Sequence, residues 1–300
     1  MTLQFGMVLM TDLPLEEQRS AWQRLEELGF DQLYVGDLSH SYGVVEIEGK
    51  QRVAATPGTY YEAWSMLVDM AAHTTRAHIG TLVASPILRP PVLLAMQAAA
   101  LDQLSDGRFE LGIGLGVAYD HPAMGVPHWR WEERAARYRE YVTLVDQLLR
   151  TREGQVEFKG EYYQTTQPAL NPGCAQRPRV RIHTAGQSGT AVRVAAEIGD
   201  VWHGPARFND TVDEAFERLR KRNQQLDRHC EKHGRDPSEV TRALDVMELL
   251  DGMESPEKYE EVVTRGVEVG FTEFVSVLRH DHSPAVLERI ATHVIPKLRR

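Results

Sequence analysis

The hydrophobic positions of the chain follow two spacings that alternate along its length. Apolar runs such as His78–Ala84 are typical of strands buried on both faces, whereas apolar positions three and four residues apart, as in Leu15–Leu28, predict amphipathic helices. The predicted strands are Leu3–Met10, Gln32–Gly36, His78–Ala84, Arg108–Gly114, Val180–Thr184, Val201–His203, Arg242–Leu250 and Glu273–Leu278. The helices predicted to follow them are Leu15–Leu28, Tyr61–Thr74, Val92–Leu104, Glu132–Leu149, Ser188–Ile198, Val212–His233, Pro256–Val269 and Pro284–Leu298.

This alternation predicts a (β/α)8 barrel, with residues 1–300 forming a single domain. Parallel strands need long connections, which the helices supply, and eight such units in about 300 residues match a barrel. A doubly wound open sheet is the alternative. Two segments are longer than the other connections between the predicted strands and helices. Residues 38–60 are expected to be a polar loop, and residues 152–179 an insertion with a hairpin at Val156–Tyr163 that turns at Gly160.

Composition and charge narrow the class of protein. Of the 300 residues, 42% are hydrophobic, which suffices for a sizeable core. The formal net charge is −9, and without a basic stripe this argues against nucleic-acid binding. The longest uncharged apolar stretches, Ile79–Leu88 and Pro90–Leu101, are shorter than the ~18 residues of a membrane span. Because no basic residue precedes Arg19 and the only cysteines are Cys174 and Cys230, we expect a reduced, cytoplasmic protein.

In a barrel, the active site lies at the C-terminal ends of the strands. This rule nominates the residues around each strand end, namely Asp37, His40, Leu82–Pro86, Gly114–Asp120, His183–Ser188, His203, Glu248 and His280–His282. A carboxylate such as Asp37, placed just past a buried strand, can bind a ligand or act as acid or base. It can equally well cap a loop.

Two glycine-containing stretches at strand ends can face a ligand. In His183–Gly189, the glycines allow close approach of the backbone, and Ser188 can cap a helix whose first N–H groups would face an anion. A tight turn explains the same residues. The stretch Glu110–Val117 is not a dinucleotide fingerprint, because its third glycine would fall on Val117. Its glycines suit either a flat ring lying against the backbone or close packing.

The histidines do not form a metal signature. The chain has no H-E-x-x-H motif, and the element His280-Asp281-His282 lacks a second cluster, since Met10-Thr11-Asp12 contains no histidine. A G-x-S-x-G elbow is also missing, which argues against a serine hydrolase. We therefore expect no bound metal.

Several stretches together carry a family resemblance. They are Glu26–Asp31, Ile79-Gly80-Thr81-Leu82-Val83-Ala84-Ser85-Pro86, Leu88-Arg89-Pro90-Pro91, Gln97–Phe109, Leu111-Gly112-Ile113-Gly114 and Ala185–Asp200. This combination resembles the luciferase-like oxidoreductases, which include bacterial luciferase, flavin-dependent monooxygenases and oxidoreductases that use the deazaflavin coenzyme F420. The resemblance covers about residues 3–204, and the last third of the chain fits only in its rhythm of strands and helices.

The resemblance implies that a flavin-type ring lies across the strand ends. It implies a cis peptide bond between Leu82 and Val83 that supports the ring. The residues that it assigns to cofactor binding are Asp37, Leu82, Val83, Ser85, Val117, Ala185, Gly186, Gln187 and Ser188. Relatives that oxidise sugar phosphates often carry glutamate at the position of Val117, so this chain is expected to favour an apolar substrate.

The acid–base residue departs from the family pattern. Many relatives carry histidine directly after the acid that follows the second strand, but this chain has Leu38 there. The nearest histidine is His40, which together with Asp37 is the candidate for catalysis.

The resemblance leads to three hypotheses of function. The first is an F420-dependent oxidoreductase that transfers a hydride between the deazaflavin and a small organic substrate, with Arg89, Arg179, Arg181 and Arg193 as candidates for meeting the polyanionic cofactor tail. The second is a monooxygenase that uses oxygen and reduced FMN (FMNH2) supplied by a partner reductase. The third is a relative that holds a flavin without turnover. Members of the family usually associate, so a homodimer is expected.

Overall fold

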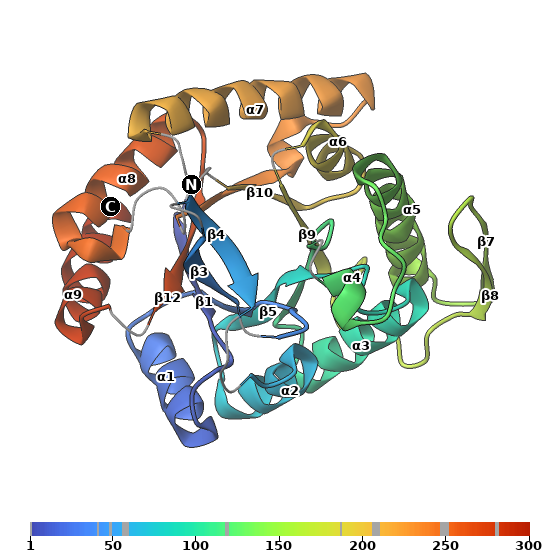
Figure 1. Cartoon of the computed structure of the whole chain (residues 1–300), viewed down its shortest axis with the longest axis horizontal. Coiled ribbons are helices and arrows are strands. Elements are labelled where there is room, and N and C mark those ends of the chain that lie inside the picture. Colours follow the sequence, from blue (N-terminus) through green and yellow to red (C-terminus); the bar gives the residue numbers. More distant parts are fainter. Residues whose placement is uncertain are drawn as a thin grey trace.

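Eight parallel strands close into a barrel in the order β1-β12-β11-β10-β9-β6-β5-β2 (Figure 1). The computed structural model describes residues 2–40, 42–47, 50–55, 60–117, 120–186, 188–205, 211–246, 252–279 and 282–300, with only the backbone at 42–55. The barrel strands are β1 (Gln4–Leu9), β2 (Gln32–Val35), β5 (His78–Ala84), β6 (Phe109–Ile113), β9 (Arg181–Ala185), β10 (Val201–Pro205), β11 (Thr241–Asp245) and β12 (Glu273–Leu278). The closed barrel confirms the predicted fold and excludes the open sheet.

Helices surround the barrel as an outer ring (Figure 1). They are α1 (Leu15–Glu27), α2 (Ala63–His73), α3 (Pro91–Leu104), α5 (Trp131–Arg150), α6 (Gly189–Glu197), α7 (Val212–Lys232), α8 (Pro256–Glu268), α9 (Pro284–Arg289) and α10 (Ile295–Leu298). The short helix α4 (Asp120–Ala123) lies in the connection after β6, inside this ring (Figure 1). Local signals explain where several begin: proline opens α3 and α8, and a capping box between Thr211 and Glu214 opens α7. Among the described residues, no helix has the length and apolarity to cross a membrane.

The strands separate two cores of different character. Outward-facing side chains such as Phe5 and Met7 of β1 pack against the helices in one large hydrophobic cluster. The interior of the barrel holds a small apolar cluster made of Val8, Tyr34 and Val275, with Leu82 and Val277 packed against it. The other inward positions are largely glycine or polar residues. The barrel interior is therefore mostly polar, apart from this small apolar cluster.

Two antiparallel hairpins lie outside the barrel. The first, β7 (Gln155–Lys159) with β8 (Gln164–Pro168), is the hairpin predicted within the insertion at residues 152–179. The second corrects a prediction: residues 38–60 are not merely a loop, because β3 (Tyr42–Ile47) pairs with β4 (Lys50–Ala55). The alternating β-forming residues of this polar segment favour a hairpin around its glycine.

Candidate active site

Asp37 joins the end of β2 to the loop that follows β5. Its side chain is 2% exposed, and its Oδ1 lies 2.5 Å from Nη2 of Arg89. Its Oδ2 accepts from Arg89 Nε at 3.3 Å and from the backbone N–H of Ser85 at 3.2 Å. Burial raises the pKa of Asp37, and the Arg89 guanidinium opposes this shift. The two-pronged pair favours the ionised carboxylate, so Asp37 anchors the Ser85 loop and its oxygens are already engaged.

His40 is held by a chain of two hydrogen bonds. Its Nδ1 lies 2.7 Å from Ser39 Oγ, and the Ser39 hydroxyl donates to Asp120 Oδ1 at 2.7 Å. Asp120 is fully buried at the start of α4. Because the single hydroxyl proton goes to the carboxylate, the Ser39 oxygen accepts a hydrogen bond from His40 Nδ1. The chain Asp120–Ser39–His40 thus orients the imidazole with its proton on Nδ1.

The floor at the strand ends is flat because glycine is required there. The peptide bond between Leu82 and Val83 is cis, as expected, and both residues are half-buried. A Cβ added to Gly114 on the next strand would come within 2.3 Å of Val83 Cγ2. Val117, which follows this strand, is 39% exposed. A floor without side chains at Gly114 fits a planar ring lying across β5 and β6.

The loop between β9 and α6 fits a phosphate. Gly186 has a φ of +134°, a conformation that residues with side chains rarely adopt, and its carbonyl accepts from Trp202 Nε1 at 3.1 Å. The Ser188 hydroxyl oxygen caps α6, which leaves other N–H groups of the first turn facing outward. Ala185, Gly186 and Ser188 are half-buried, and Gln187 lies outside the described residues.

A buried polar network fills the barrel below this floor. Glu110 Oε2 accepts from the Tyr34 hydroxyl at 2.6 Å and lies 3.3 Å from His183 Nε2. His183 Nδ1 in turn lies 2.9 Å from His203 Nε2, and both rings are fully buried. Burial also lowers the pKa of His203 well below its usual value, so this histidine is neutral at pH 7. The prediction that His183 and His203 lie at the barrel mouth is wrong, because β9 and β10 each continue two residues further.

Three other predicted strand-end residues, Glu248, His280 and Asp281, lie outside the described residues. In the part of the chain that the structure describes, no group of three or more His, Cys, Asp or Glu side chains is arranged to hold a metal ion.

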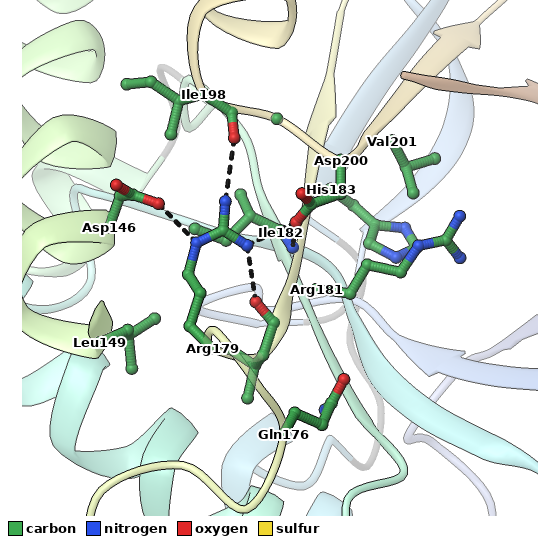
Figure 2. A network of polar contacts seen from close by, with 12 residues as sticks. Asp146, Leu149, Gln176, Arg179, Arg181, Ile182, His183, Ile198, Asp200 and Val201 are labelled. Carbon is green, nitrogen blue, oxygen red and sulfur yellow. Dashed lines mark hydrogen bonds and ion pairs between the residues drawn. The ribbon is translucent and has the colours of Figure 1, made fainter. Parts of the chain in front are cut away.

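Arg179 is wholly engaged within the protein (Figure 2). Its Nε lies 2.5 Å from Asp146 Oδ1, and its Nη1 lies 2.5 Å from Asp200 Oδ2. Nη1 and Nη2 also donate to the carbonyls of Val180 and Ile198. The guanidinium ties α5 to the strand β9, and the prediction that it meets a cofactor tail is wrong.

Two more arginines are likewise occupied by carboxylates. Arg181 begins β9, at the opposite end of the barrel from the loops, and its Nη2 lies 2.9 Å from Glu273 Oε1. Arg89 is held by Asp37, as described above. Of the four arginines expected to meet a polyanionic tail, only Arg193 is exposed, on α6.

Comparison with known proteins agrees with this geometry. A family described as luciferase-like monooxygenase matches residues 3–288. The chain belongs to the luciferase-like monooxygenase family. Among relatives of this family member, an F420-dependent glucose-6-phosphate dehydrogenase of Intrasporangium calvum is 27% identical over 92% of each chain. The pyrimidine monooxygenase RutA of Acinetobacter baylyi is 28% identical over 59% of this chain and 46% of its own.

Solved structures of the family share the fold. The coenzyme F420-dependent tetrahydromethanopterin reductase of Methanopyrus kandleri superposes with a TM-score of 0.78 over 99% of both chains, at 17% identity. The family match and the relatives named above show that this luciferase-like protein is an oxidoreductase. These relatives include both F420-dependent enzymes and monooxygenases.

Asp120 is the site residue that sequence reasoning left without a role. It falls in the predicted strand-end range Gly114–Asp120, but its partner Ser39 lies 81 positions away in the chain. No local pattern pairs the two, since the contact depends on how the loops after β2 and β6 meet above the barrel.

Proposed function

We propose that this luciferase-like enzyme uses coenzyme F420 to transfer a hydride to or from a small organic molecule. The observation that carries the proposal is the similarity to an F420-dependent relative over 92% of both chains. The glycine floor supports it, because Leu82, Val83 and Gly114 would hold the ring and the start of α6 would hold the phosphate. When bound, the cofactor supplies the carbon that gives or accepts the hydride.

Within this proposal, His40 moves the proton that accompanies the hydride. Ser39 and Asp120 orient the imidazole so that Nε2 binds or releases the proton. Asp37 keeps the loop at Ser85 in place through Arg89 and takes no proton itself. Val117 occupies the position where sugar-phosphate-oxidising relatives often carry glutamate, which supports an apolar substrate over a sugar phosphate.

A titration tests the cofactor. The protein contains five tryptophans, whose fluorescence is followed as F420 or FMN is added, each in oxidised and reduced form. Low-micromolar affinity for F420 with weaker binding of FMN is the expected result. The proposal would be overturned if neither oxidised nor reduced F420 bound to the protein.

A second candidate is a monooxygenase that receives reduced FMN from a partner reductase. The similarity to the RutA monooxygenase favours it. This function predicts oxygen uptake with reduced FMN and an oxygenated product, whereas an F420-dependent hydride transferase predicts neither. The two assays share the same purified protein, so one preparation separates the candidates.

Homodimer formation stays a prediction. Helices α2 and α3 expose Val68, Leu93, Met96 and Leu104, which would suit association. Analytical ultracentrifugation of the full chain checks it, with a single 34.0 kDa species as the contrary result.

A further inference from the structure

A cationic surface interrupts this acidic protein on helix α7. Four residues, here called the α7 basic face, are Arg218, Lys221, Arg222 and Arg228. Lys221 and Arg222 follow Arg218 by three and four residues and Arg228 follows it by ten, so all four lie on one side of the helix. Together with Gln225 they line a surface depression of about 430 Å³. The net charge of the chain is −9, so the cluster is a local feature and not part of a general basic character.

The middle of the α7 basic face, at Gln225, lies beside the start of α6. A Cβ added to Gly189, the first residue of α6, would lie 3.7 Å from Gln225 Nε2. At the other end of α6, Glu197 Oε1 lies 3.3 Å from His233 Nε2. Both contacts join residues 36 positions apart, so the two helices run side by side in the same direction.

Helix α7 extends well past the start of α6. It begins at Val212, so about 20 Å of the helix precedes Gln225 at 1.5 Å per residue. Arg222 and Arg218 belong to the half-buried stripe that contains Gln225. They lie about 5 and 10 Å further along the axis, beyond the first N–H groups of α6. An anion at the start of α6 would therefore have cations ahead of it along α7.

The charges on this face differ from those of the buried arginines. Arg222 donates a hydrogen bond from Nη1 to Gln225 Oε1 at 2.6 Å. Lys221 lies 3.2 Å from Glu217, which also pairs with Arg220 on the far side of α7. Among the described residues, no carboxylate pairs with Arg222 or Arg228, whereas Arg179 and Arg181 each meet two. Neighbouring cations repel one another, so an anionic ligand stabilises the cluster.

We propose that the α7 basic face binds a chain of carboxylates that continues from a phosphate held at the start of α6. This assignment rests on the proposed function. Coenzyme F420 carries glutamate carboxylates beyond its phosphate, whereas FMN ends at its phosphate. The α7 basic face would thus recognise the part of the deazaflavin cofactor that FMN lacks.

Binding of cofactors with different tails tests the assignment. Tryptophan fluorescence gives the dissociation constants of F420 with several glutamates, F420 trimmed to one glutamate, and FMN. The variants are Arg222→Glu and the double variant Lys221→Glu/Arg222→Glu. Arg220→Glu is the matched control, because it reverses the same charge on the opposite side of α7. Thermal unfolding of the free proteins verifies that all variants fold alike.

The expected result is a selective loss. Charge reversal at Arg222 should weaken binding of the long-tailed cofactor about tenfold, the single-glutamate form less, and FMN not at all. Raising the salt concentration should weaken long-tailed F420 in the wild type most. Equal affinity for long and short tails, or an equal loss in Arg220→Glu, would overturn the α7 assignment alone. Failure of every F420 form to bind the wild type would overturn the proposed function and this assignment with it.

Discussion

Replacing Glu110 by glutamine tests whether a buried charge stabilises the barrel. Glu110 is 1% exposed. Its carboxylate lies 3.3 Å from His183 Nε2, 3.2 Å from His78 Nδ1 and 3.3 Å from Arg181 Nη1. Burial alone would raise the pKa of Glu110, but His183, His78 and Arg181 outweigh it and hold that pKa well below its usual value. Glutamine keeps the shape and removes the charge that these groups share.

The expected loss of stability follows from what remains in place. Removing one member of a fully buried ionic network costs about 3–5 kcal/mol. Of the partners of Glu110, His183 is fully buried, whereas the side chains of His78 and Arg181 are 49% and 27% exposed, which favours the lower end of this range. Arg181 keeps Glu273 at 2.9 Å, so we expect about 3 kcal/mol at pH 7. For a chain of this size that corresponds to a fall in Tm of roughly 6–12 °C. Urea unfolding followed by tryptophan fluorescence measures it.

A control and a pH series make the test specific. Glu260→Gln removes the half-buried partner of the exposed Lys297 and should change stability by less than about 0.5 kcal/mol. A lowered pKa in the folded state stabilises above the ordinary value of 4.5, and this contribution disappears as the pH falls through the folded pKa. The difference between wild type and Glu110→Gln should therefore shrink below pH 4.5, and it should also decline at higher pH as His78, whose pKa Glu110 raises, loses its proton. A loss under about 1 kcal/mol at pH 7 would refute the reasoning.

Three further substitutions test the site itself. Asp120→Asn removes the negative charge that holds the Ser39 hydroxyl and so orients His40, so turnover should fall about 10- to 100-fold with an unchanged cofactor dissociation constant; normal turnover in steady-state assays would contradict the relay. Gly114→Ala brings a methyl group within 2.3 Å of Val83 Cγ2, so fluorescence titration should show weaker cofactor binding, and unchanged affinity would exclude this floor. Ser188→Ala removes the cap of α6, and thermal unfolding should show a loss of about 1 kcal/mol; an unchanged Tm would show that water replaces the cap.

The barrel could be predicted because its strands are buried on both faces. His78–Ala84 and Glu273–Leu278 have the predicted bounds, since parallel strands packed inside and outside read as apolar runs. The hairpin of β3 and β4 was missed for the opposite reason. Its segment is polar overall, and the signal was the local alternation around Glu48-Gly49, which composition hides.

The sequence predicts those features of the site that lie within one strand end and the loop that follows it, but not the contacts between two such loops. The cis bond at Leu82–Val83 and the glycine loop before α6 lie within single segments, and they were found. The pair of Asp37 with Arg89 joins residues 52 positions apart, so it follows from the meeting of two loops and not from a motif. Arg181 could have been excluded from the sequence, because it begins its strand and so lies at the end of the barrel away from the loops.

The preference for F420 or FMN depends on those parts of the site that only one of the two cofactors would contact. A flat floor at Gly114 and a capped helix start at Ser188 would accept the ring and the phosphate of either cofactor, so substitutions there weaken both. The cofactors differ beyond the phosphate, where the guanidinium of Arg222, which donates to Gln225 and has no carboxylate partner among the described residues, lies about 5 Å past Gln225 along α7. Attraction between exposed charges falls with ionic strength, whereas contacts of the ring with a buried floor hardly change. The salt dependence of binding therefore separates recognition of the tail from recognition of the ring, even before a substrate is known.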